Sequence, residues 1–371
     1  MNKGFWASVT ILAGTIIGAG VFSLPYIFRE VGFLRGVLYL VFFACVYFVI
    51  HSMYAATLET NAGNHQFFFY AKRFLKKPFS GIAPWVILGE LILVLAVYLI
   101  LVPTFVSLVF GSNNVVLLIV FWFLGSIFIF ARLKWLGLAE FVGAIGIVAI
   151  IFTLFLTGIL KGSAFSLSSK SNFNLLTFLL PFGPLLFSLS GRPAISKVVE
   201  EHKKASAIGR SFSLRKSIFL GTFIPAALYF LFAFGVLRLN PNITPETLNG
   251  LNFLSQPLLF LLGCMGLLTI WTSYFMVAIN IKDTLVVDLG WKRGIAAIFI
   301  FALPLALYFA GFQNFISAIS LTGGIFLGLE GMFVTAMWHR AFPNHHFRQL
   351  APLLYLIFGT AIVYEIARFI L

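Results

Sequence analysis

Glu90, Glu330 and Arg192 are ionisable side chains deep inside long apolar runs of the sequence, where a charge is costly unless it has a partner or a function. Glu90 lies about 11 residues into its run, which is roughly 16 Å deep at 1.5 Å per helical residue. Glu330 lies about 8 residues before the end of its run, and Arg192 lies near the end of another. A carboxyl at such a depth can take up and release a proton, or it can form a static ion pair. The sequence leaves both roles open and offers either acid as the partner of Arg192.

The first apolar run contains a stretch that weakens a helix and makes its backbone groups available for binding. From Gly14 to Pro25 it reads GTIIGAGVFSLP, with three glycines within seven residues. Each glycine costs a helix about 1 kcal/mol relative to alanine, and a broken helix is tolerated in lipid only where protein or a cavity surrounds it. Freed N–H groups can bind a carboxylate, and freed carbonyls can bind a cation. The alternative is close helix packing through Gly14 and Gly18, which form a GxxxG motif.

The sixth apolar run is interrupted by two prolines. From residue 181 it reads PFGPLLFSLSGRPAI, and Pro184 and Pro193 each remove a helix hydrogen bond. Between these prolines lie Ser188, Ser190 and Gly191. A single proline kink is common in membrane helices. Interruptions at corresponding places in the first and the sixth runs, however, favour a binding site formed by both.

The elements that must position these residues are membrane-spanning helices. The chain has 371 residues, of which 61% are apolar and only 10% are charged, and a helix needs about 20 consecutive apolar residues to cross a bilayer. Such continuous apolar runs exclude a water-soluble enzyme and disfavour an outer-membrane barrel, in which apolar residues alternate. Eleven spans are predicted, at about residues 5–28, 33–58, 79–109, 115–131, 135–160, 175–196, 217–238, 252–281, 294–310, 312–338 and 351–371.

Lys and Arg are distributed unevenly between the two sets of loops. With a cytoplasmic N-terminus, 18 of the 25 basic residues fall on the cytoplasmic side and 6 on the outer side, while Arg192 lies within a span. Because cytoplasmic loops carry an excess of Lys and Arg, this distribution predicts a cytoplasmic N-terminus and an outer C-terminus. It also accounts for the net charge of +14 without a nucleic-acid partner.

The first ten spans fall into two matching halves. Spans one and six are interrupted, spans three and eight are unusually long, and spans four and five are joined by a short connection near residues 132–134. Because five is odd, the second half begins from the opposite side of the membrane, as in an inverted repeat. We therefore predict a single transmembrane domain over residues 1–371, with repeat A at about 5–160, repeat B at about 175–338 and an extra helix at about 351–371.

The two interrupted stretches resemble a known family. The residues from Gly14 to Pro25 are similar to the first helix of permeases in the amino acid–polyamine–organocation superfamily, and closest to the amino acid/auxin permease branch, which includes bacterial aromatic amino acid permeases. The heptapeptide FSLSGRP, which begins at Phe187, resembles the sixth helix of that branch. The resemblance implies an all-α integral membrane protein with the leucine-transporter-like 5+5 inverted repeat and broken helices one and six. It also implies proton- or sodium-coupled amino acid uptake.

The resemblance also assigns substrate-binding roles. The N–H groups of Gly18, Ala19 and Gly20 would receive the substrate carboxylate, and the absence of the Ser that many relatives have in place of Ala19 removes one hydroxyl donor. Carbonyls of the sixth helix would receive the substrate ammonium, and this segment would line the side-chain pocket through Phe187, Ser188, Ser190 and Gly191. Phe187 would act as a gate or platform. Relatives often have His in place of Arg192, so the resemblance leaves the coupling role of that position open.

Three hydroxyl residues in the eighth span are candidates for an ion site: Thr269, Thr272 and Ser273. In sodium-coupled members of the fold, hydroxyls here complete a sodium site with carbonyls of the first helix, which correspond to Gly14 and Ile17. Oxygen ligands suit a small hard cation, and the alternative is that the hydroxyls bond back to their own helix. Some proton-coupled relatives place a Lys from the fifth helix at this site. The predicted fifth span has no Lys in its interior, which favours sodium over that particular proton mechanism.

The predicted function is a secondary active transporter that imports an amino acid by alternating access, coupled to a sodium or proton gradient. No ATP-binding motif of the GxxxxGK[S/T] type is present, and the cysteines and histidines form no metal-binding pattern. The pocket candidates Phe187, Trp271 and Tyr98 favour a neutral or aromatic substrate. The alternatives are a lipid-modifying enzyme, which would need clustered carboxylates or metal ligands, and a channel, which would need a ring of like residues.

The expected surroundings and partners follow from this function. The protein is expected in the plasma membrane as a multi-pass permease, in the inner membrane if the cell is prokaryotic. Its partners would be the amino acid and the lipid bilayer, with no cofactor beyond a candidate sodium ion. The sequence leaves open the identity of the amino acid, uptake versus exchange, and the oligomeric state.

Overall fold

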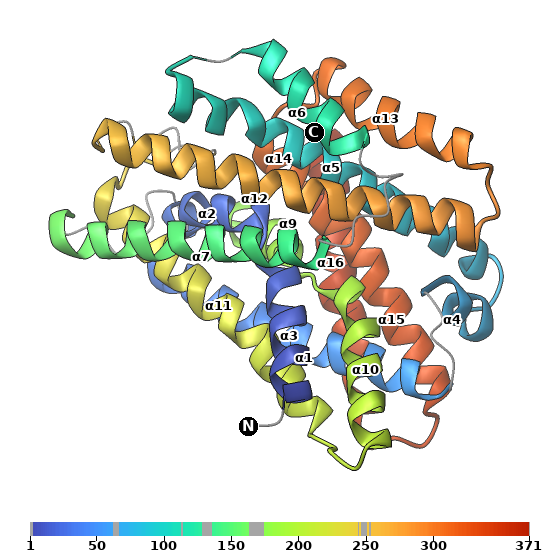
Figure 1. Ribbon diagram of the computed structural model, residues 1–371. Helices are drawn as coiled ribbons and strands as arrows, with labels where there is room; N and C mark the ends of the chain where they lie inside the picture. The colour runs from blue at the N-terminus through green and yellow to red at the C-terminus, as the bar shows by residue number, and fades with distance from the viewer. Residues whose placement is uncertain are drawn as a thin grey trace.

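The computed structural model describes residues 3–61, 67–112, 114–127, 136–162, 174–243, 245, 251 and 254–370, with the side chains of 136–141 and 346 excluded. Every regular element in these ranges is helical (Figure 1). The apolar runs form long helices because only a helix satisfies all its backbone hydrogen bonds within one segment in lipid. These are α3 (Phe33–Glu59), α5 (Phe79–Phe110), α7 (Leu136–Lys161), α11 (Leu214–Leu239), α12 (Gln256–Asp283) and α16 (Ala351–Ile370). Shorter helices are α4 (Phe67–Phe74), α6 (Val115–Ile127) and α13 (Arg293–Phe309).

The first span is broken where its glycines predicted. Helix α1 (Lys3–Ile16) ends before Gly18, the 3₁₀ turn η1 (Ala19–Ser23) follows, and α2 (Leu24–Val31) completes the span. The two halves are bent by 47°. Gly18 has extended backbone angles, φ −148° and ψ −162°, so it interrupts the helix rather than merely kinking it.

The sixth span consists of three helical pieces. They are α8 (Leu175–Leu179), α9 (Phe182–Leu189) and α10 (Arg192–Ala207), and α9 is separated from α10 by Ser190 and Gly191. Ser190 is extended, with ψ 131°, and Pro193 lies in the first turn of α10, where a missing N–H has no cost. The structure continues α10 well beyond residue 196, the predicted end of this span.

The tenth span contains a π-helical segment that the sequence analysis did not predict. Helix α14 (Phe315–Leu321) leads into the π-helix η5 (Thr322–Leu327), which leads into α15 (Gly328–Ala341). A shorter π-helix, η4 (Thr284–Asp288), extends α12, and the 3₁₀ helix η6 (His346–Leu350) precedes α16. Such π segments are frequent at functional sites because they locally displace one face of a helix.

The helices agree with the predicted multi-pass architecture. Among the described residues, eight helical segments are long and apolar enough to cross a membrane, and the bent pair of the first span makes a ninth. The two shorter apolar helices α6 and α13 occupy the predicted fourth and ninth spans. The predicted short connection near residues 132–134 lies outside the described residues.

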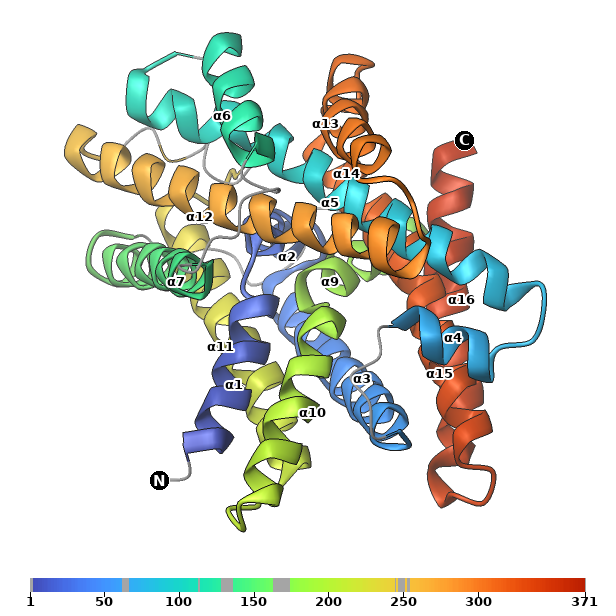
Figure 2. The same ribbon diagram turned by 45° about the vertical axis from the view of Figure 1, so that its right-hand side comes forward.

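The helices pack so that the breaks of the two broken spans lie in the interior, whereas the far ends of α1 and α10 reach the surface. Helix α1 lies beside α10 and α11, and α5 packs against α12 along much of its length (Figure 2). Helices α15 and α16 lie side by side, and the two termini lie well apart in both views. Buried aromatic rings fill the space around η1: the ring of Phe22 packs edge-on against Phe105 and Phe232, at centroid distances of 5.4 and 5.7 Å.

Candidate substrate and ion site

A central cavity lies where the two broken spans meet α5 and α12. Its lining includes seven of the residues predicted for the site: Gly18, Ala19, Gly20, Phe187, Ser188, Ser190 and Glu90. Tyr98 and Leu91 of α5, Val277 of α12 and Leu327 of η5 add apolar surface. The cavity therefore combines backbone of both breaks, one carboxyl and an apolar side.

The first break offers backbone donors and almost no side chain to this cavity. The first residues of a helix have N–H groups without an intrahelical acceptor, and η1 begins at Ala19, directly at the cavity. The Val21 N–H donates to the Gly18 carbonyl at 3.3 Å, and this hydrogen bond closes the first turn of η1. The segment is thus suited to an anionic group, as the sequence analysis expected.

The glycine that requires close packing is Gly20, which lies outside the GxxxG pair. A Cβ on Gly20 would lie 2.5 Å from the Ser188 Oγ and 2.7 Å from its Cα. A Cβ on Gly14 would meet nothing within 4 Å, and one on Gly18 nothing nearer than 3.8 Å. The alternative of helix packing through Gly14 and Gly18 is therefore wrong in this structure, and the two breaks touch each other at Gly20 and Ser188.

Two buried tyrosines that the sequence analysis missed hold the carbonyls of the half-helices. The Tyr229 hydroxyl lies 2.6 Å from the Ile16 carbonyl and 3.0 Å from the Ser188 carbonyl, which brings the ends of α1 and α9 to one point. The Tyr47 hydroxyl donates to the Leu186 carbonyl at 2.6 Å. A tyrosine inside an apolar span was the available signal, because its hydroxyl needs a partner there.

The residues around the second break have separate roles. Phe187 remains partly exposed and lines the cavity. Gly191 is buried against α1, where a Cβ would lie 2.7 Å from the Ile16 Cγ1 and 2.8 Å from the Leu12 Cδ1. Gly191 therefore lets the start of α10 approach α1, and it does not appear among the residues that line the central cavity.

A buried charge cluster lies directly beside the cavity. The Arg192 Nε donates to the Glu330 Oε2, and the Arg192 Nη2 lies 3.7 Å from the Glu90 Oε2. The guanidinium also lies over the ring of Phe67 at 5.1 Å. Arg192, Glu90 and Glu330 are 8%, 4% and 2% exposed. Arg192 thus contacts both acids, whereas the sequence had left one or the other as its partner.

The cluster has one cation for two carboxyls. With both acids ionised it would have a net negative charge among apolar residues, and an uncompensated buried charge is strongly unfavourable. The Glu330 carboxylate has the direct hydrogen bond, while the Glu90 Oε2 is buried without one. Glu90 is therefore the carboxyl better suited to hold a proton, and it is also the one that borders the cavity.

The predicted sodium ligands gather around a second cavity that adjoins the first. Gly14, Ile17, Thr269, Thr272 and Ser273 all line it, and it shares Thr15, Gly18, Leu91 and Tyr98 with the central cavity. Two of the hydroxyls are bonded to backbone. Thr269 Oγ1 donates to the Met265 carbonyl at 2.8 Å, and Thr272 Oγ1 donates to the Thr269 carbonyl at 2.9 Å. The Thr269 Oγ1 also lies 3.1 Å from the Gly143 carbonyl of α7. The structure thus brings the set together with both threonine hydroxyls bonded to backbone carbonyls.

A third cavity continues from these two toward the end of α12. It shares Leu91, Pro193 and Asn280 with the second cavity, and Arg192, Asp283 and Asp288 also line it. Lys197 of α10, an exposed residue, lines the second cavity. Polar and charged side chains therefore accompany the path from the central cavity to one end of the molecule. Among the described residues, no group of three His, Cys, Asp or Glu side chains could hold a metal ion.

Comparisons with known proteins agree with this architecture. The model of the tryptophan/tyrosine permease family matches residues 1–364. A structure of MhsT in complex with L-phenylalanine is similar with a TM-score of 0.61 and 14% identity, over 100% of this chain and 98% of that one. Mhp1, a nucleobase-cation-symport-1 family transporter in a closed conformation with bromovinylhydantoin bound, gives 0.62 and 12%, over 98% and 90%. A search among curated proteins finds no match. The predicted leucine-transporter-like fold is confirmed by these structural similarities.

Proposed function

The chain belongs to the tryptophan/tyrosine permease family, and we propose that it moves an aromatic amino acid together with a proton by alternating access. It is a permease of the cell membrane and not an enzyme. The observation that carries the coupling proposal is the buried cluster of Arg192, Glu90 and Glu330, with Glu90 at the central cavity. The inner membrane remains the proposed location if the cell is prokaryotic.

The central cavity suits a zwitterion with an apolar side chain. The N–H groups at Gly18, Ala19 and Gly20 would bind the carboxylate, and carbonyls of the second break near Ser190 would bind the ammonium. An aromatic ring would lie against Phe187 and the apolar lining. The similarity in fold to the L-phenylalanine complex of MhsT supports this arrangement.

Proton and substrate binding would be linked because Glu90 borders both the cavity and Arg192. With a proton on Glu90, Arg192 and Glu330 form a neutral pair and the cluster has no excess charge. Loss of that proton would leave Arg192 shared between two carboxylates, which changes the contacts between α5, α10 and α15. The third cavity, lined by Arg192 and Asp283, would give the proton a route to one side.

Sodium coupling is the second candidate. It is favoured by the second cavity, where Gly14, Ile17, Thr272 and Ser273 lie around one space. A hydroxyl group that donates a hydrogen bond to a backbone carbonyl can still coordinate a cation through the lone pairs of its oxygen. The site would then connect α1 to α12, next to the substrate.

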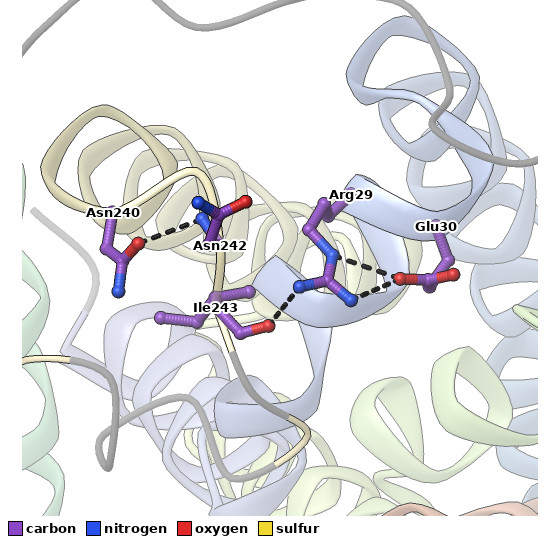
Figure 3. Close-up of polar contacts among 5 residues, drawn as sticks. All are labelled: Arg29, Glu30, Asn240, Asn242 and Ile243. Carbon is purple, nitrogen blue, oxygen red and sulfur yellow. Dashed lines mark hydrogen bonds and ion pairs between the residues drawn. The ribbon is translucent and has the colours of Figure 1, made fainter.

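The proposed orientation has a cytoplasmic N-terminus and an outer C-terminus. It follows from the distribution of Lys and Arg, and two contacts support the grouping of the segments into two sides, because each contact joins segments assigned to the same side. On the proposed cytoplasmic side, the Lys203 Nζ donates to the Asn61 carbonyl at 2.7 Å. On the proposed outer side, Arg29 pairs with Glu30 and donates to the Ile243 carbonyl (Figure 3). The proposed repeats, about 5–160 and 175–338, each begin with a broken span.

The proposal is tested with purified protein in liposomes and labelled tryptophan or tyrosine. We expect an inward proton gradient, without sodium, to drive accumulation above the equilibrium level. Glu90→Gln should abolish gradient-driven accumulation, and the control Glu59→Gln, at the end of α3 away from the cavity, should retain it. Accumulation driven by sodium alone would replace the first candidate with the second, and no accumulation under either gradient would contradict both.

A further inference from the structure

A third buried acid lies on the opposite side of the breaks from Arg192. Glu365 lies in α16, the helix after the two proposed repeats, and is only 3% exposed. Its Oε1 is buried without a hydrogen-bond partner. Ionisable residues at membrane depth are functional candidates by default, and none of the steps proposed above uses this one.

The carboxyl of Glu365 lies against the crossing of α9 and η5. A Cβ on Gly183 of α9 would lie 3.0 Å from the Glu365 Oε1, and a Cβ on Gly324 of η5 would lie 2.3 Å from its Cγ. The two backbones also touch each other, since a Cβ on Gly323 would lie 1.9 Å from the Gly183 carbonyl oxygen. Glycines thus make room for the Glu365 side chain at the point where α9, the helix that leads into the second break, meets the tenth span.

The charges around Glu365 compensate it poorly. The Arg368 Nη1 lies 3.8 Å from the Glu365 Oε2, beyond hydrogen-bond distance, and it donates to the Ser320 Oγ at 3.2 Å. Arg368 is about one-third exposed, so water shares its charge. The sequences of α9, α14 and η5 contain no ionisable side chain.

Helix α15 packs along α16 and carries Glu330, His339 and Arg340, whose partners are Arg192, Arg348 and the Phe74 carbonyl. Further ionisable groups belong to α2 and to α16 itself. Tyr26, Arg29 and Glu30 belong to α2, and Tyr26 interacts electrostatically with Arg368. Arg29 is already engaged by Glu30 and by the Ile243 carbonyl. On α16, Tyr364 donates to the Leu176 carbonyl at 3.1 Å. An ionised Glu365 would therefore depend on one partly hydrated guanidinium, 3.8 Å away, which donates its hydrogen bond to Ser320 instead.

We propose that Glu365 is a second proton-binding site, which exchanges its proton with the outer side when the packing around it opens, and whose protonation stabilises the closed packing of α9 and η5 on α16. This inference rests on the proposed proton-coupled transport. A neutral carboxyl is compatible with the buried position seen here, whereas an ionised one favours a rearrangement that brings water to it. Protonation from outside would thus favour closure of the outer side over the substrate.

The test measures outer-side opening without transport. Two single-cysteine variants are made. One replaces Leu179, which is buried in α8, and the other replaces Leu175, which is 71% exposed in the same helix. Both native cysteines are replaced, and a membrane-impermeant thiol reagent is added outside the liposomes. The ratio of the two labelling rates reduces the effect of pH on thiol reactivity, and comparison with Glu365→Gln in the same cysteine backgrounds removes the part that burial of one thiol leaves.

In the wild-type background we expect this ratio to rise about threefold or more when the outer pH is raised from 6 to 8, as linkage requires. Glu365→Gln, which mimics the protonated form, should hold the ratio at its pH 6 value. The control Glu30→Gln, which changes another acid on the proposed outer side, should behave as wild type. A wild-type response in Glu365→Gln, or no response in the wild type, would overturn the proposal.

A second variant and a comparison of labelling with uptake complete the experiment. If Glu365→Gln does not fold, Glu365→Asp should shift the midpoint of the response, and an unshifted midpoint would overturn the proposal. Labelling needs no ion gradient, so it separates the two claims. Proton-driven uptake with no Glu365-dependent labelling response would contradict only this inference, and a labelling response without proton-driven uptake would contradict the proposed coupling.

Discussion

The two breaks in the membrane helices differ in what surrounds them. At the first break, between α1 and η1, the cavity meets mainly backbone and small residues, from Gly18 to Gly20. At the second, Ser190 and Gly191 are followed directly by Arg192, which brings two buried acids to the site. The difference suggests a division of roles, with substrate binding at the backbone break and ion coupling at the charged break. The contact between Gly20 and Ser188 would connect the two.

The largest effect is expected from removing the cation at the charged break. Arg192→Met leaves Glu90 and Glu330 buried without their partner, which costs about 3–5 kcal/mol in comparable cases. We expect a large fall in the thermal unfolding temperature and loss of uptake. In Arg192→Met/Glu330→Gln, removal of one excess carboxylate should recover part of the stability. Equal stability of wild type and Arg192→Met would show that the cluster contributes little.

A smaller but still large effect is expected at the backbone break. Gly20→Ala places a methyl group against Ser188, and overpacking of this kind costs about 1–3 kcal/mol. Because the two breaks would be forced apart, we expect weaker substrate binding in a thermal-shift titration. Gly81→Ala is the matched control, since a Cβ there meets nothing within 4 Å. Equal affinities of the two variants would separate the Gly20–Ser188 contact from substrate binding.

An intermediate effect is expected where one hydroxyl serves both breaks. Tyr229→Phe removes a hydrogen bond worth about 0.5–1.5 kcal/mol and leaves the carbonyls of Ile16 and Ser188 without this donor. We expect a slower maximal uptake rate, since the ends of α1 and α9 lose their common contact. Tyr39→Phe, which loses an exposed bond to the Phe178 carbonyl, should transport as wild type. The same loss in both variants would mean that the position of Tyr229 is unimportant.

The smallest effect is expected at the candidate sodium site. Thr272→Val removes a hydroxyl that donates to the Thr269 carbonyl, and stability should fall by no more than about 1 kcal/mol. If a proton is the coupling ion, uptake should be the same in sodium and in choline media, for wild type and variant alike. Sodium stimulation that disappears in Thr272→Val would move the coupling role from the second break to the first.

Much of the fold follows from the sequence because its signals are local. Apolar runs predicted the positions of the spans, and the glycines and prolines predicted the breaks at Gly18 and at Ser190–Gly191. The π-helix η5 was not predicted, since nothing in the sequence distinguishes an inserted π turn from an ordinary helix containing Gly323 and Gly324. The repeat boundaries remain a prediction.

The candidate site was predictable only in part because its contacts join distant segments. Burial in an apolar run identified Glu90, Glu330 and Arg192, but only the three-dimensional packing shows that Arg192 contacts both acids. Tyr229 resembles any aromatic residue of a membrane helix until its hydroxyl partners are known. Glu365 lies near the end of its span, where the sequence alone does not distinguish a buried acid from one exposed at the membrane surface.

The central claim is that substrate and proton move together through Glu90. The most direct measurement is the pH change that tryptophan or tyrosine produces when it is added outside sodium-free liposomes without an imposed gradient. The account predicts that the medium becomes alkaline with wild type, with a fixed ratio of protons to substrate, and that Glu90→Gln gives no pH change while it still binds substrate. Substrate entry without a pH change in wild type, or an unchanged proton signal in Glu90→Gln, would contradict it.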